Sequence, residues 1–264
     1  MKKEDLSDHQ IIFGDSRKVL KDLPKECVDL VVTSPPYNVD KDYGNTVYDD
    51  SGPYGEYLDM LEEVFTHVYD VMKEHRFLLI NIGRESVVNT NAHMARILEK
   101  IGFKYQNIII WKKPEGAARQ SFTERWPHAR WYQPKLVTEQ ILVYSKGEIN
   151  GNRPERTDDN RFDKEFYNEY KTNIWEINPA NHKEHPAIFP IELPKTAIKF
   201  YSQKGERVLD PFGGTCTTSK AAFMEDRKSI CIELNQDYEN AIRKKLGVGQ
   251  QKLNGSVDYD VTVW

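Results

Sequence analysis

Residues 28–38 read Val-Asp-Leu-Val-Val-Thr-Ser-Pro-Pro-Tyr-Asn, an almost continuously apolar run that ends in two prolines. The apolar part, Val28–Thr33, is typical of a strand that is buried on both faces of a parallel sheet. The prolines fix the backbone φ angle and remove two N–H donors, so the strand ends there. The segment beyond it presents carbonyl acceptors between the Ser34 hydroxyl and the Tyr37 ring. Because ligands of open α/β sheets bind beyond the carboxyl ends of strands, we expect a planar ligand with an amino group here.

Predicted strands and helices alternate on both sides of this run. Short apolar segments predict further strands at Gln10–Phe13, Phe77–Ile82, Tyr105–Trp111, Gln140–Tyr144, Arg207–Leu209 and Ser229–Glu233. Apolar residues at helical spacing predict helices at Tyr54–Lys73, Val87–Ile101, Glu192–Tyr201, from Thr217 onward and at Asp237–Leu246. This alternation predicts a doubly wound, mostly parallel α/β sheet. The highly charged stretch 147–171 is predicted to be an insertion or loop, and the end of the tail an edge strand, a partner contact or disorder.

The composition is that of a folded globular protein. The 264 residues include 37 Lys and Arg and 41 Asp and Glu, a net charge of −4, so any surface for nucleic acid must be local. The chain has no apolar run of about 18 residues and no apolar segment near its start, which predicts a cytoplasmic protein without a membrane span or signal peptide. Three well-separated cysteines, Cys27, Cys216 and Cys231, predict no disulfide framework, with Cys27 and Cys231 as core thiols. His182 and His185 have no further ligand nearby, so no metal site is predicted.

A second motif occupies residues 208–218, Val-Leu-Asp-Pro-Phe-Gly-Gly-Thr-Cys-Thr-Thr. It reads as a strand, a glycine-containing turn and hydroxyl residues that can cap a helix N-terminus. Glu233 ends the next predicted strand, where a carboxylate can hold ribose hydroxyls. The chain lacks the G-x-G-x-x-G pattern and the Gly-Lys-Ser/Thr of a P-loop, which disfavours a nicotinamide cofactor or a nucleoside triphosphate.

Together the two motifs resemble those of S-adenosylmethionine-dependent DNA amino-methyltransferases, with Thr33–Asn38 as the catalytic motif and Asp210–Gly214 as the cofactor motif. Three further segments agree with this family: Phe13–Asp15, Glu139–Lys146 and His185–Pro190. The order of the segments is that of the family's permuted β group, and the resemblance covers residues 10–245. One position departs from the family: Cys216 stands where a second glycine is usual, and its Cβ would restrict φ and crowd the methionine end of the cofactor.

The resemblance implies a circularly permuted class I methyltransferase fold with a seven-stranded sheet and a target-recognition insertion. Residues 1–146 would form the catalytic half, including the basic segment 112–135. Residues 147–184 would form the inserted target-recognition region, residues 185–246 the cofactor-binding half and residues 247–264 a tail.

The resemblance also implies which residues form the site. The catalytic residues would be Ser34, Pro35, Pro36 and Tyr37. S-adenosylmethionine would be bound by Asp15, Thr33, His185, Phe189, Asp210, Pro211, Phe212, Gly213, Gly214, Thr215, Thr217, Glu233, Leu234 and Asn235. No covalent nucleophile is expected. A cysteine directly after a proline would suggest methylation of cytosine C5, and none of the three cysteines follows a proline.

The expected substrate is the N4 amine of a cytosine flipped out of double-stranded DNA. Ser at the first motif position resembles the N4-cytosine group, whereas Asp would resemble the N6-adenine group. N6-adenine is the first alternative, and an RNA or protein-glutamine methyltransferase is the second. A non-enzymatic DNA-recognition module is ranked last because residues 34–37 are intact. A homodimer and a companion restriction endonuclease that acts on the same site are left open.

The basic segment 112–135 supplies local positive charge for DNA. It contains six Lys and Arg against two Glu, and four aromatic residues lie among them, with Trp111 directly before the segment. Phosphate contacts are expected from Lys112, Lys113, Arg119, Arg125 and Arg130. The alternative interpretation, a solvated charged loop with aromatic residues packed beneath it, is equally open for any single residue.

Overall fold

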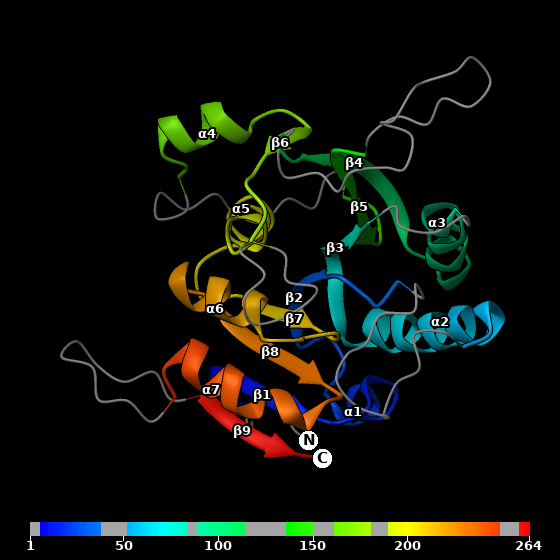
Figure 1. Cartoon of the computed structure of the whole chain (residues 1–264). Coiled ribbons are helices and arrows are strands. Elements are labelled where there is room, and N and C mark those ends of the chain that lie inside the picture. The colour runs from blue at the N-terminus through cyan, green and yellow to red at the C-terminus, as the bar shows by residue number, and fades with distance from the viewer. Residues whose placement is uncertain are drawn as a thin grey trace, which may run out of the picture.

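The computed structural model describes residues 6–37, 52–83, 89–114, 136–149, 161–180, 190–248 and 259–264. Within these ranges nine strands form one sheet in the order β6-β4-β5-β3-β2-β7-β8-β1-β9 (Figure 1). Their bounds are β1 (His9–Phe13), β2 (Val28–Thr33), β3 (Met72–Ile82), β4 (Lys104–Lys112), β5 (Thr138–Lys146), β6 (Ile174–Glu176), β7 (Arg207–Asp210), β8 (Lys228–Glu233) and β9 (Tyr259–Val263). β5 runs antiparallel to β3 and β4, and the other neighbouring pairs are parallel. The predicted α/β class and mostly parallel sheet are confirmed.

The prediction of seven strands was too low, because the sheet is extended at both edges. β6 pairs with β4 on one edge, and it lies in the stretch that the sequence predicted as the target-recognition insertion. β9 pairs with β1 on the other edge, so the tail ends in the edge strand that the sequence left as one of three alternatives. Both added strands are short, and only Trp175 of β6 and Tyr259 of β9 are buried.

Helices cover both faces of the sheet (Figure 1). One face carries α1 (Ser16–Asp22), α2 (Tyr54–Val71) and α3 (Thr90–Ile101), whose apolar side chains join one core cluster. The other carries α5 (Glu192–Tyr201), α6 (Thr217–Met224) and α7 (Glu239–Leu246), preceded by the 3-10 helix η5 (Gln236–Tyr238). A short helix, α4 (Lys164–Tyr170), contacts β6. No helix in the described ranges is long and apolar enough to cross a bilayer.

Local sequence explains where several elements begin and end. The Asp15 carboxylate accepts the Arg17 N–H and so starts α1, while Gly102, at φ +119°, ends α3 in the left-handed conformation that glycine favours. The strand predicted at Val28–Thr33 and the helix predicted at Glu192–Tyr201 have the predicted bounds. The sequence missed α1 because the helix has only seven residues, and it missed α4 because none of the helix is buried.

The sheet brings together segments that are far apart in the chain. β2 pairs in parallel with β7, so that Leu30 lies opposite Val208 and Val31 opposite Leu209. The carboxyl ends of β2 and β7 are therefore neighbours, and residues 34–37 emerge beside residues 211–214. The two motifs that the sequence singled out therefore lie side by side at the carboxyl ends of neighbouring central strands, which is where ligands bind in this class of fold.

Candidate active site

The segment Ser34–Tyr37 directly follows β2 and is partly buried. The Ser34 Oγ and the Tyr37 OH lie 2.8 Å apart, within hydrogen-bond distance. Tyr57 of α2 donates its hydroxyl proton to the Pro36 carbonyl at 2.8 Å and so fixes the segment from the helix side. The serine hydroxyl and the proline carbonyls thus lie directly after the carboxyl end of β2, the position that the sequence predicted for them.

Three polar side chains lie behind this segment that sequence reasoning did not assign to catalysis. The Asn81 Nδ2 donates to the Glu139 Oε2 at 2.7 Å and to the Tyr37 OH at 3.3 Å. The Lys113 ammonium forms a very short ion pair with Glu139. Asn81 is the last residue but one of β3, Glu139 is the second residue of β5 and Lys113 follows β4, so only the sheet order brings them together. Glu139 lies in one of the segments that carried the family resemblance, which was the one available signal.

Asp210 connects the two motifs from beneath the site. Its carboxylate accepts the Thr33 hydroxyl and the Thr218 hydroxyl, each at 2.7 Å, and the Phe212 N–H at 3.1 Å. Burial raises the pKa of Asp210, although the three hydrogen bonds favour the ionised form. Both carboxylate oxygens are therefore engaged by the chain's own donors, and Asp210 holds the strand end and the loop in register.

The loop after β7 combines one tightly packed glycine and one open glycine. The Gly213 N–H donates to the Ile232 carbonyl at 2.9 Å, and a Cβ on Gly213 would collide with the Cys231 sulfur. Gly214 has φ +52°, and a Cβ there would meet no atom within 4 Å. One side of the loop is therefore packed on β8 while the Gly214 backbone faces open space, as a loop that approaches a ligand requires.

Glu233 ends β8 directly beside this loop. Its carboxylate accepts the Gly214 N–H at 2.6 Å and the Asn235 N–H at 2.8 Å, and the residue is 9% exposed. Burial raises the pKa of Glu233 to about 7, against the lowering effect of these backbone hydrogen bonds. The side chain is thus a buried acceptor at a strand end, with a charge that changes near neutral pH.

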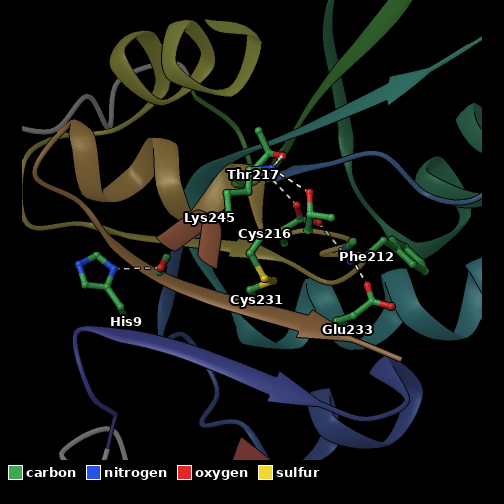
Figure 2. Close-up of a disulfide and its surroundings, with 12 residues drawn as sticks. His9, Phe212, Cys216, Thr217, Cys231, Glu233 and Lys245 are labelled. Atoms are coloured by element: carbon green, nitrogen blue, oxygen red, sulfur yellow. Dashed lines mark hydrogen bonds between the residues drawn. A yellow bond between two sulfur atoms is a disulfide. The ribbon is translucent and has the colours of Figure 1, made fainter. Parts of the chain in front are cut away.

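A disulfide joins Cys216 to Cys231 within this site (Figure 2), which corrects the prediction of no disulfide and of Cys231 as a core thiol. Cys216 immediately precedes α6 with φ +54°, and Cys231 is in the adjacent β8, so the fold brings their Cα atoms to 6.2 Å. The positive φ accounts for the family's preference for glycine at this position. Cys27 is buried and takes no part in a disulfide, as predicted.

Hydroxyl groups and a lysine surround the start of α6. The Lys245 ammonium of α7 donates to the Thr215 hydroxyl at 2.8 Å and to the Thr217 hydroxyl at 2.5 Å (Figure 2). The sequence singled out both threonines but not the lysine, which follows them by about thirty positions and comes from another helix. This lysine places a positive charge beside the loop.

The remaining predicted site residues are placed as follows. Pro211 is buried and accepts the Ser16 hydroxyl, Phe212 packs on Phe65 with ring centroids 6.2 Å apart, and Leu234 is half-buried next to Glu233. Burial opposes ionisation of Asp15, but hydrogen bonds from Arg17 hold the pKa of Asp15 below its ordinary value.

Of the residues predicted to contact DNA, two are described. Lys112 is exposed and forms an ion pair with Glu176 at 2.7 Å, and Lys113 is the partner of Glu139 described above. His185 and Phe189, predicted to bind the cofactor, and Arg119, Arg125 and Arg130, predicted to bind DNA, lie outside the described residues. Among the residues that the structure describes, no group of three or more His, Cys, Asp or Glu side chains could hold a metal ion.

The geometry therefore combines two adjacent half-sites. One is a glycine loop with a buried carboxylate at the next strand end, the arrangement that α/β folds use to hold a nucleoside. The other offers a hydroxyl and a carbonyl, both acceptors for the hydrogens of an amine. The Thr33–Asp210 hydrogen bond links the two half-sites, so a group bound at one would face a group bound at the other.

Comparison with known proteins agrees with this geometry. A type II methyltransferase of Methanocaldococcus jannaschii, M.MjaI, is 30% identical over 97% of this chain and 96% of its own length. The DNA adenine methyltransferase YhdJ of Escherichia coli is 26% identical over 90% of this chain and 82% of its own length. The structure of TTHA0409 from Thermus thermophilus in complex with S-adenosyl-L-methionine superposes with a TM-score of 0.74 at 28% identity, and the match covers 97% of this chain and 98% of that one. The sequence pattern of the family described as DNA methylase, which comprises N6 and N4 methyltransferases, matches residues 28–244, and the chain belongs to this family.

Proposed function

We propose that this protein transfers a methyl group from S-adenosylmethionine to the N4 amine of a cytosine flipped out of duplex DNA. Membership of the DNA methylase family establishes the class of reaction. The observation that carries the finer assignment is Ser34, which stands directly after β2 with its Oγ 2.8 Å from the Tyr37 OH. A neutral hydroxyl in this place is typical of the N4-cytosine group.

The loop and strand ends fit the proposed cofactor. Gly214 leaves open space above the loop, and the buried Glu233 carboxylate can accept the two ribose hydroxyls. The cofactor supplies a sulfonium methyl group that is already activated for transfer. Asp210 and Thr33 hold the loop against the catalytic segment, so the residues of the chain contribute mainly position and electrostatics. The Lys245 ammonium suits the cofactor's carboxylate, which neutral threonines alone would bind less strongly.

The catalytic segment acts on the amine through hydrogen bonds. The amine of cytosine is a weak nucleophile because its lone pair is delocalised into the ring. The Ser34 Oγ and the Pro35 carbonyl would each accept one N–H, which draws the nitrogen toward a tetrahedral geometry and localises the lone pair. The Tyr37 ring supplies a stacking face for the base once it has left the duplex.

DNA is proposed to bind through the basic segment 112–135 and through residues 147–184 as the target-recognition region. The described part of the second region places aromatic side chains at the surface, with Phe162 37% and Tyr167 48% exposed. These rings stack on each other with centroids 6.3 Å apart. Exposed aromatic rings suit stacking on bases, and the basic charges of segment 112–135 suit contact with phosphates.

N6-adenine is the second candidate for the methylated base. The similarity to YhdJ, a DNA adenine methyltransferase, favours it. Both bases present the same two amine hydrogens, and the Ser34–Pro35 acceptor pair suits either. Identification of the methylated nucleoside therefore distinguishes cytosine from adenine as the substrate base.

The test is to methylate plasmid DNA with isotopically labelled cofactor, digest it to nucleosides and identify the labelled nucleoside by mass. N4-methylcytosine is expected, and N6-methyladenine would replace the proposed substrate with the second candidate. Ser34→Ala is expected to retain both binding affinities but to lose about a hundredfold or more in single-turnover rate, as loss of a transition-state acceptor does. Full activity of Ser34→Ala would remove the serine from the mechanism.

A further inference from the structure

We infer that Asn81 is a positioning residue for methyl transfer, held by Glu139 and Lys113, and that it acts through the Tyr37 hydroxyl on Ser34. The inference rests on the proposed role of Ser34. It goes beyond that role because it assigns a function to three side chains outside the catalytic motif, one on β3, one on β5 and one directly after β4.

The first step fixes the Asn81 amide. The Glu139 carboxylate is paired with the Lys113 ammonium and only accepts hydrogen bonds. The Asn81 atom 2.7 Å from the Glu139 Oε2 must therefore be the amide nitrogen. The ion pair thus determines which way the Asn81 side chain faces.

The second step fixes the Tyr37 hydroxyl. The same Asn81 nitrogen lies 3.3 Å from the Tyr37 OH, and its second hydrogen can be donated there. Tyr37 then accepts this bond and has its own proton to donate. The Ser34 Oγ lies 2.8 Å from the Tyr37 OH and can accept that proton, whereas the backbone carbonyl of Asn81 is farther away, at 3.5 Å. Tyr37 is therefore the donor to Ser34.

The third step concerns Ser34. One lone pair of its oxygen is occupied by the Tyr37 proton, and the other remains directed to an amine N–H. Without Asn81 the Tyr37 oxygen could instead accept the Ser34 proton, and the serine hydroxyl would rotate away from its role as acceptor. Such preorganisation contributes to the rate rather than to binding, because the acceptor matters most as charge develops on the amine.

Burial supports a functional role for Asn81. The residue is 3% exposed, and its Oδ1 has no hydrogen-bond partner within the described part of the chain. Both hydrogen bonds of its amide nitrogen, to Glu139 and to Tyr37, are therefore made away from solvent. The position of Gly83 also fits, because a Cβ there would lie 2.9 Å from the Tyr37 Cε2 and displace the ring that Asn81 holds.

The test is a double-mutant cycle of Asn81→Leu and Tyr37→Phe, which removes the amide and the hydroxyl but keeps side chains of similar size. Single-turnover rates are measured at saturating DNA and cofactor. Each single variant is expected to lose about tenfold, the effect of one hydrogen bond, with unchanged dissociation constants for DNA and cofactor. The double variant is expected to be no slower than Tyr37→Phe alone, because Asn81 acts only through the hydroxyl that is already absent.

Asn91→Leu is the matched control. Asn91 also has a buried Oδ1 without a hydrogen-bond partner in the described part of the chain, and it donates its amide N–H to Gln140 of β5 at 2.6 Å rather than to Tyr37 or Glu139. Its variant is expected to transfer methyl groups at the wild-type rate. Thermal unfolding of all variants verifies that each is folded at the assay temperature.

Three results would overturn the inference. A double variant slowed by the product of the two single effects would mean that Asn81 does not act through Tyr37. A wild-type rate for Asn81→Leu would mean that it does not act on transfer at all. Either result, together with an inactive Ser34→Ala variant, leaves the proposed function standing. A fully active Ser34→Ala variant would overturn the inference and the proposed role of Ser34, while the mass of the labelled nucleoside still tests the proposed function separately.

Discussion

The buried carboxylate of Glu233 predicts that cofactor affinity depends on pH near neutrality. Burial raises the pKa of this group from 4.5 to about 7, so a large fraction is protonated and neutral at pH 6. A neutral carboxyl group has lost acceptor capacity and must place a proton of its own, so it is a poorer partner for two ribose hydroxyls. The affinity for S-adenosylmethionine should therefore fall as the pH is lowered through 7.

The size of the effect follows from the ionised fraction. With a pKa of about 7, roughly nine-tenths of Glu233 is ionised at pH 8 and roughly one-tenth at pH 6. If only the ionised form binds, the apparent dissociation constant rises about tenfold between these pH values. Asp15 does not add to this change, because its pKa lies below the ordinary value for Asp.

Isothermal titration calorimetry of the cofactor between pH 6 and pH 8 measures the effect. The α-amino group of the cofactor titrates in the same range, with a pKa of about 8, so the wild type alone is not sufficient. Glu233→Gln is the control: it keeps the size of the side chain and the titration of the ligand but has no carboxylate. The Glu233→Gln variant is expected to bind the cofactor more weakly than the wild type at pH 8. The ratio of the two dissociation constants is expected to approach one toward pH 6.

A constant ratio between pH 6 and pH 8 would refute this reasoning. If Glu233→Gln then bound as tightly as the wild type, Glu233 would not contact the ribose. If it bound more weakly by the same factor throughout, Glu233 would contact the ribose but remain ionised over the whole range.

Three further predictions concern the loop, the catalytic ring and the DNA surface. Cys231→Ser removes a disulfide that spans 15 residues and should lower the free energy of unfolding by about 3 kcal/mol in urea titrations; an unchanged midpoint would contradict the cross-link. Gly83→Ala places a Cβ 2.9 Å from the Tyr37 Cε2 and should slow single-turnover methyl transfer without changing cofactor affinity, and a wild-type rate would show that the ring can move freely. Neutralising Arg119, Arg125 and Arg130 should reduce the slope of log affinity for DNA against log salt by about 2.7, at about 0.9 per phosphate contact. An unaltered slope would assign these three arginines to ordinary surface.

Much of the fold could be predicted from local sequence signals. β2 is buried throughout and is followed closely by two consecutive prolines, so its sequence pattern was unambiguous. The elements that were missed give weak local signals: α4 has no buried residue and β6 has three residues. The count of strands failed for this reason, because both extra strands are at the edges of the sheet.

The site was predictable where its residues are close in sequence and not where tertiary structure assembles them. Ser34–Tyr37 and the loop after Asp210 are contiguous motifs, whereas Asn81 and Glu139 meet only through the sheet order. The disulfide was missed for a similar reason, since sequence spacing does not reveal that Cys216 and Cys231 face each other. Lys113 was predicted to contact DNA, and the structure gives it a partner in Glu139.

The position of β1 has a consequence for how the protein is made. β1 comes early in the chain but pairs with β8 and β9, and its His9 Nδ1 is hydrogen-bonded to the Ser229 hydroxyl, 220 positions later. At about 5–20 residues per second, a ribosome needs on the order of 10–40 s to synthesise the intervening chain. During that time the apolar strand Ile11–Phe13 has no neighbour to pair with, and such exposed segments favour aggregation. The yield of folded protein should therefore depend on the speed of translation and on chaperones that bind the nascent chain, more than on the stability of the finished fold.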